Sequence, residues 1–175
     1  MYSFPFSPVS FSGRILEDAP ERGDVAVFRK PTETDIDYIK RIIGLPGDTI
    51  QVINGVLHIN GEAVKRRQIE DYVPENEERM RTRVTHYLET LPNGVEHDII
   101  EDMGDRGRLD NTPEYVVPPG HYFAMGDNRD HSQDSRVLSQ VGFIPIENFI
   151  GKATIIFFSW GESGPRFDRF FDVIK

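Results

Sequence analysis

The sequence of 175 residues predicts an all-β protein made of antiparallel sheets. Three observations favour this class. The 15 Gly and 12 Pro are spread between short apolar runs, a spacing typical of strands and turns. Those runs are rich in β-branched and aromatic side chains. Helical periodicity is scarce and no internal repeat occurs, so antiparallel strands are favoured over helices.

The first two strands are predicted at residues 24–28 and 36–43. The second strand runs into the sequence Gly-Leu-Pro-Gly-Asp at residues 44–48. Pro46 presets φ for the first central position of a turn, and Gly47 supplies a positive φ at the second. We therefore expect a type II turn after the second strand.

A β-hairpin is predicted in residues 49–59. Asn54-Gly55 separates two short apolar runs, and this dipeptide is the strongest local hairpin signal. Residues 62–67 are expected to continue the meander.

The second half of the chain alternates weak and strong patterns. Residues 68–114 are charged and weakly patterned, with 84–91 and 98–103 as the plausible strands. Residues 115–125 predict two short strands joined by Pro-Pro-Gly, and residues 153–158 predict a buried strand.

The composition excludes several function classes. Because the chain has no cysteine, disulfides, zinc–thiolate sites and a cysteine nucleophile are excluded. A formal net charge of −9 and a pI of about 5.0 argue against a nucleic-acid partner, since phosphate binding needs clustered Lys and Arg. The short basic cluster at residues 65–67 is followed by acidic residues and is interpreted as a solvated face.

The sequence as given has no run of roughly 18 apolar residues, the length that a membrane-spanning helix needs. Residues 1–8 have neither the charged nor the apolar region of a signal peptide. We therefore expect the start of this sequence to be a truncation point.

Lys40 is the first candidate for chemistry. Strand alternation places it on the same face as Tyr38 and Ile42, with Arg41 on the other face. If that face is buried, desolvation lowers the pKa of the amine and makes it a usable general base. The alternative is that Lys40 extends its ammonium group into water over an apolar stem.

The second candidate is residues 125–136, Met-Gly-Asp-Asn-Arg-Asp-His-Ser-Gln-Asp-Ser-Arg, which are dense in hydrogen-bonding groups. They predict either a loop tied down by Asx turns and Asp–Arg pairs, or a loop whose hydroxyl orients the Lys40 amine. A calcium loop is disfavoured, because the acids, glycine and glutamate of an EF-hand are not in register.

Three segments, in this order, resemble signature boxes of bacterial signal peptidase I: residues 22–28, 38–48 and 126–136. The resemblance implies a partly open, barrel-like catalytic core of antiparallel sheets, a fold type shared with self-cleaving SOS-repressor proteases. The core would comprise residues 1–53 and 115–175. Residues 54–114 would form a smaller, loop-rich β lobe inserted into it.

The same resemblance implies a serine endopeptidase with a Ser/Lys dyad, which needs no metal or organic cofactor. Lys40 would be the general base and Ser132 would orient it. Supporting roles fall to an ion pair of Asp134 with Arg136, to Asp127 and Arg129 in holding the loop, and to Arg41 as a structural residue.

The segment that carries the nucleophile in that family, of the type Ser-x-Ser-Met-x-Pro-Thr-Leu, has no counterpart in this sequence. Ser3, Ser7, Ser10 and Ser12 lie in Phe- and Pro-rich sequence without this pattern, so the nucleophile is not assigned. We expect an N-terminally truncated member that is inactive alone.

The resemblance implies further that the partners are the signal-peptide region of exported preproteins and the membrane lipid surface, and that the catalytic region lies on the outer side of the cytoplasmic membrane. Two alternatives stay open. One is an inactive β-rich binding module that keeps only the scaffold, and the other is a protease of the SOS-repressor type.

Overall fold

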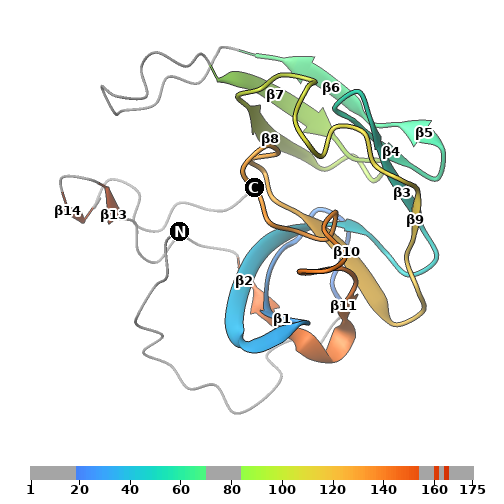
Figure 1. Ribbon diagram of the computed structural model, residues 1–175, viewed down its shortest axis with the longest axis vertical. Coiled ribbons are helices and arrows are strands. Elements are labelled where there is room, and N and C mark those ends of the chain that lie inside the picture. The colour runs from blue at the N-terminus through green and yellow to red at the C-terminus, as the bar shows by residue number, and fades with distance from the viewer. Residues whose placement is uncertain (1–18, 70–83, 154–159, 162–163, 166–175) are drawn as a thin grey trace.

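The computed structural model describes residues 19–69, 84–153, 160–161 and 164–165 (Figure 1). The strand predicted at residues 153–158, and the four serines weighed as nucleophiles, lie outside this description or at its border. Every described sheet is antiparallel, so the predicted all-β class is confirmed. Within the same residues, no helix is long and apolar enough to cross a membrane.

The largest sheet has five strands in the order β11-β10-β2-β1-β12. Its central strand β2, 12 residues long, carries the predicted general base. The five strands are β1 (Val25–Lys30), β2 (Glu33–Gly44), β10 (His121–Met125), β11 (Ile144–Pro145) and β12 (Phe149–Lys152).

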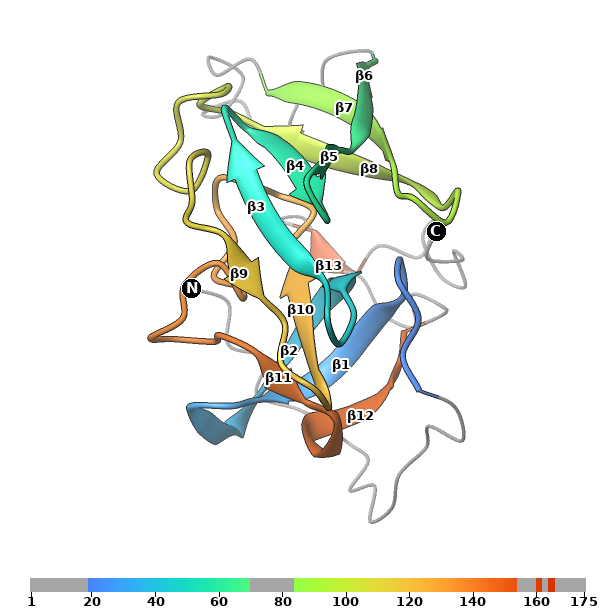
Figure 2. The ribbon, with the colours of Figure 1, turned by 90° about the vertical axis from the view of Figure 1, so that its right-hand side faces the viewer.

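This sheet is curled into a barrel-like shape. Its two edge strands, β11 and β12, are separated in sequence only by the 3-10 turn η1 (Ile146–Asn148). Across a flat sheet the edges would be roughly 19 Å apart, because neighbouring strands are about 4.8 Å apart. Four residues of extended chain reach at most roughly 14 Å. The edges therefore approach each other (Figure 2), and since no β11–β12 pairing is found in the described chain, the barrel is partly open.

A four-stranded sheet and a three-stranded sheet complete the fold. The four-stranded sheet has the order β5-β4-β3-β9, from β3 (Thr49–Ile53), β4 (Val56–Ile59), β5 (Glu62–Ala63) and β9 (Tyr115–Val116). The three-stranded sheet has the order β6-β7-β8, from β6 (Lys65–Gln68), β7 (Thr85–Thr90) and β8 (Glu96–Glu101). Two short strands, β13 (Trp160–Gly161) and β14 (Gly164–Pro165), pair separately. The division into a core and a lobe of residues 54–114 stays a prediction.

Two apolar cores hold the sheets together, and β2 contributes to both. Ile42 packs with Phe28 and Phe149 in a core lined by the five-stranded sheet. Ile43, on the other face of β2, packs in a second core that includes Ile50 of the four-stranded sheet. Because both Ile42 and Ile43 are fully buried, the end of β2 that carries Lys40 and Arg41 is fixed on both faces.

The predicted turns form with the expected backbone geometry. Gly47 has a φ of 92°, and the Asp48 N–H donates to the Leu45 carbonyl at 3.0 Å, as in a type II turn. Asn54 and Gly55 have φ values of 47° and 75°, which a type I′ hairpin turn requires.

The meander departs from its predicted course at β6. β5 pairs with β4 as expected, but β6 pairs with β7 of the three-stranded sheet. The chain changes sheets between Ala63 and Lys65, at the buried Val64.

Candidate active site

Lys40 lies in β2, directly opposite Ala26 of β1. Its neighbours on the same face are Tyr38, which packs against the barrel core, and the buried Ile42. This apolar environment penalises the charged form, so burial lowers the pKa of the Lys40 ammonium. The nearby carboxylates of Asp134 and Asp127 oppose this effect, and Arg136 adds to it.

The side chains of Ser132 and Lys40 both lie next to Gly126. Residues 126–136 follow β10, which pairs with β2 and so brings the loop to the end of that strand. A Cβ atom on Gly126 would overlap the Ser132 hydroxyl and would lie 3.5 Å from Lys40 Nζ. Ser132 Oγ is itself buried. The absence of a side chain at Gly126 therefore leaves one space that the serine hydroxyl and the lysine amine both border.

A buried ion pair shapes this loop. Arg136 donates to Asp134 from Nε at 2.9 Å and from Nη2 at 2.8 Å, and Nη2 also donates to the Arg129 carbonyl at 2.7 Å. Asp134 also accepts the Gly126 N–H at 3.0 Å. Burial acts to raise the pKa of Asp134, but the hydrogen-bonded Arg136 outweighs it and holds that pKa below its usual value.

Arg41 fixes the start of the loop from the other face of β2. Its guanidinium donates to both carboxylate oxygens of Asp127, at 3.0 Å and 2.8 Å, and to the Gly23 carbonyl at 2.9 Å. Arg41 is only 4% exposed. A bidentate pair of this kind sets both the position and the orientation of the carboxylate.

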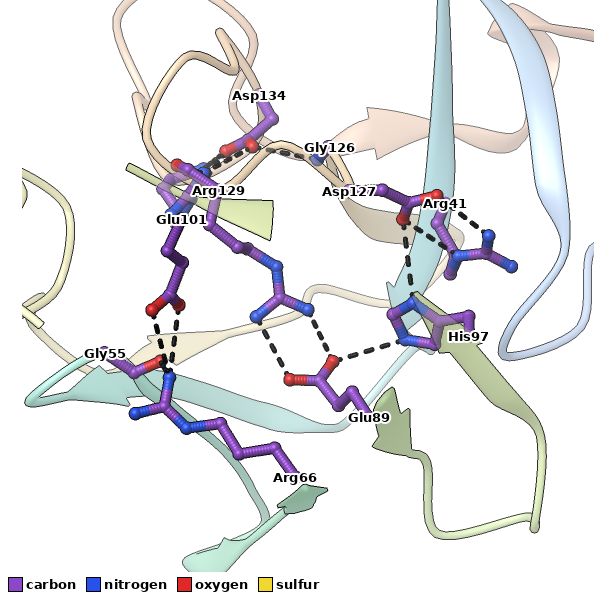
Figure 3. Close-up of polar contacts among 11 residues, drawn as sticks. Arg41, Gly55, Arg66, Glu89, His97, Glu101, Gly126, Asp127, Arg129 and Asp134 are labelled. Atoms are coloured by element: carbon purple, nitrogen blue, oxygen red, sulfur yellow. Dashed lines mark hydrogen bonds and ion pairs between the residues drawn. The ribbon is translucent and has the colours of Figure 1, made fainter. Parts of the chain in front are cut away.

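A row of ionisable side chains continues from Asp127 into the three-stranded sheet (Figure 3). His97 of β8 faces Asp127 on one side and Glu89 of β7 on the other. Glu89 in turn accepts two hydrogen bonds from Arg129, one of them at 3.1 Å. Although burial acts to raise the pKa of Glu89, Arg129 and His97 lower it to about 2.

A second buried carboxylate, Glu101, lies on the neighbouring strand β8. Arg66 of β6 donates to Glu101 of β8 at 3.1 Å. Even so, burial raises the pKa of Glu101 to about 7.

The structure brings together all the side chains singled out from the sequence, because all belong either to β2 or to residues 126–136; they are Lys40, Arg41, Asp127, Arg129, Ser132, Asp134 and Arg136. Their catalytic and supporting roles stay predictions. Sequence analysis missed Glu89, His97 and Glu101. Strand alternation could have shown that two of them are buried, because His97 and Glu101 lie on the same buried face of β8 as Ile99.

The fold and this site together define an all-β protein with a half-buried lysine beside a serine hydroxyl. The sequence profile of the family described as signal peptidase, peptidase S26, matches residues 9–160. The chain belongs to this family.

Individual relatives agree with this assignment. Signal peptidase I of Rickettsia typhi is 45% identical over 161 residues, which cover 89% of this chain and 58% of that protein. Signal peptidase I of Rickettsia canadensis is 44% identical over 162 residues, with the same coverage. The chain thus spans 58% of the length of these curated relatives. A crystal structure of a signal peptidase I from Enterococcus faecalis is 28% identical, with a TM-score of 0.45, and covers 78% of this chain and 98% of that one.

Proposed function

We propose that this chain carries the general base of a serine endopeptidase that removes signal peptides from exported preproteins. The observation that supports this most directly is the placement of Lys40, whose amine is desolvated and borders the same space as the Ser132 hydroxyl. Membership of the signal peptidase family agrees with this reaction class.

In the proposed mechanism the nucleophile is a serine other than Ser132, and it is not identified in this sequence. A serine hydroxyl is a weak nucleophile until a neighbouring base takes its proton as it attacks the scissile carbonyl. Neutral Lys40 is that base, and the Ser132 hydroxyl orients its amine. The protonated Lys40 then donates the proton to the departing amine, which completes acyl transfer, and water hydrolyses the acyl-enzyme through the same base.

The remaining side chains act through position. The Asp134–Arg136 pair holds Ser132 over Gly126, and the Arg41–Asp127 pair fixes the loop to β2. Their function is to keep hydroxyl and amine in one orientation, because a base contributes only when it is within hydrogen-bond reach of the proton.

The proposed partners are the signal-peptide region of preproteins and the lipid surface beside which they emerge. The site would work on the outer side of the cytoplasmic membrane. The preprotein would bind in extended form as an added β-strand, with small residues before the cleaved bond. The chain by itself would be inactive, because no serine in it has the sequence context of the nucleophile.

The test starts from the gene that encodes this chain. We expect the full reading frame to encode a serine box upstream, together with one or two hydrophobic helices. The full-length protein should cleave a preprotein, and Lys40→Ala should lower kcat by on the order of 10⁴-fold or more.

Lys65→Ala is the matched control, because Lys65 is an exposed lysine of β6. It should leave cleavage unchanged. If Lys40→Ala keeps wild-type cleavage, Lys40 is not the base. If an in-frame stop lies immediately upstream, the chain is a binding module that keeps only the scaffold.

A further inference from the structure

Glu89 and His97 are two buried polar side chains that lie side by side in the three-stranded sheet. They are direct cross-strand partners on β7 and β8. Glu89 is 1% exposed and His97 is 2% exposed. Burying polar side chains so completely costs free energy unless polar or charged groups lie nearby. The groups around Glu89 and His97 therefore need to be identified.

The His97 ring lies between two carboxylates. Nε2 is 3.2 Å from Glu89 Oε2, and Nδ1 is 3.7 Å from Asp127 Oδ1 (Figure 3). A neutral imidazole has one donor and one acceptor nitrogen, whereas the imidazolium has two donors. An imidazolium would face both carboxylates with a donor, whereas a neutral ring would face one of them with a lone pair. In the described chain neither ring nitrogen completes a hydrogen bond, so both contacts are electrostatic.

We propose that His97, held in place by Glu89, is a positioning residue that fixes the carboxylate of Asp127 and thereby aligns the loop bearing Ser132 against Lys40. This inference rests on the proposed peptidase function and deepens it. It assigns the three-stranded sheet a part in the reaction, through a side chain that touches neither the substrate nor the nucleophile.

The backbone supports the same coupling. The Ile100 N–H of β8 donates to the Asp127 carbonyl at 2.9 Å, and the Arg129 N–H donates to the Ile100 carbonyl at 3.0 Å. These bonds form a parallel bridge between Ile100 and Asn128. β8 thus binds the Asp127 backbone directly, and the His97 ring of the same strand lies beside the Asp127 side chain.

Carboxylates face His97, and arginines lie beyond them. It faces Glu89 from β7 and Asp127 from the loop, and beyond these carboxylates lie Arg129 of the loop and Arg41 of β2. Asp127 is one of the groups that raise the pKa of Lys40 against the effect of burial. An imidazolium at this position would offset part of the charge of the Asp127 carboxylate and so favour the neutral amine.

The test compares pH–rate profiles of full-length protein that differ only at this residue. His97→Gln keeps an amide nitrogen near the position of Nε2, toward Glu89, but removes the group that faces Asp127. We expect kcat at pH 7 to fall about threefold to tenfold with KM unchanged, because the acid limb moves to higher pH. His86→Gln is the matched control: His86, on β7, also faces a carboxylate, Asp98 at 3.5 Å, but this pair does not include Asp127.

A second variant guards against a general packing effect. His97→Asn keeps an amide nitrogen near the position of Nδ1, toward Asp127, and should retain more of kcat than His97→Gln. In an Asp127→Asn background, His97→Gln should give no further shift of the acid limb, since the charge that it offsets is gone.

An unmoved acid limb in a folded His97→Gln protein overturns the proposal, even if kcat falls, because loss of packing alone does not move a titration. A wild-type protein that cleaves, with Lys40→Ala inactive and His97→Gln unchanged, refutes the role of His97 and leaves the peptidase function standing. Retained cleavage by Lys40→Ala refutes the peptidase mechanism itself.

Discussion

Gly126 and Ser132 fit together because residue 126 has no side chain: the serine hydroxyl occupies the volume that a Cβ atom there would fill. Lys40 Nζ lies 3.5 Å from that same point. The glycine is therefore a steric requirement of the site, and it is needed for a close approach of side chains.

Gly126→Ala should separate the two groups. The new methyl group displaces the Ser132 hydroxyl, so we expect kcat to fall by on the order of 10²-fold. Overpacking should lower the free energy of unfolding by about 1–3 kcal/mol. Gly151→Ala is the control, because a Cβ atom at Gly151 would meet nothing within 4 Å. Equal activity of the two variants would show that Ser132 is not held by this contact.

The pH dependence of cleavage should follow the Lys40 amine. Burial lowers its pKa below 10.5, so the neutral base is populated at lower pH than in an ordinary lysine. We expect kcat/KM of the full-length protein to rise with pH through this lowered pKa and then to level off. A flat profile between pH 5 and about 10 would count against a lysine base.

Ser132→Ala tests the orientation of that amine. The hydroxyl is buried beside Lys40, and its removal leaves the amine without the group that is proposed to orient it. We expect kcat to fall by on the order of 10²-fold while KM is unchanged. A rise in KM alone would instead place Ser132 in substrate binding.

The Asp134–Arg136 pair should dominate the stability of the loop. Asp134 is fully buried and Arg136 is 3% exposed. Asp134→Ala leaves a buried guanidinium unpaired, so denaturant titration should show a loss of about 3–5 kcal/mol. The exposed pair of Lys30 with Glu33 provides the comparison, and Glu33→Gln should cost no more than about 1 kcal/mol. Equal losses would mean that the buried pair is not structural.

Glu101 should make stability depend on pH near neutrality. Its pKa is about 7 in the folded protein, against an ordinary 4.5, so the folded state keeps a proton that the unfolded chain loses. This contribution is fully present below pH 4.5 and is lost as the pH rises through 7. The free energy of unfolding of Glu101→Gln, relative to the wild type, should therefore increase over that range. The exposed Glu62→Gln should show no such trend.

Local signals in the sequence predicted the local structure well. The type I′ turn at Asn54-Gly55 and the positive φ of Gly47 form where turn chemistry demands them. The alternation in β2 placed Lys40 with Tyr38 and Ile42, and the structure keeps that arrangement. Such features depend on neighbours within a few residues.

Local sequence patterns did not predict which distant segments pair with one another. β6 pairs with β7, and Arg66 of β6 reaches Glu101 on β8, 35 residues later in the chain. Glu89 and His97 are polar residues at buried positions, so a search for apolar alternation passes over them. Their partners, Asp127 and Arg129, are contributed by a loop that no local pattern links to these strands.

The separation in sequence between Asp127 and its partner Arg41, 86 residues, also sets an order of events during translation. Ribosomes release the N-terminal part of a domain first. The strand bearing Lys40 and the pair of strands bearing Glu89 and His97 therefore exist before the segment that locks them together. The Lys40 amine therefore gains its hydroxyl neighbour only when residues 126–136 emerge.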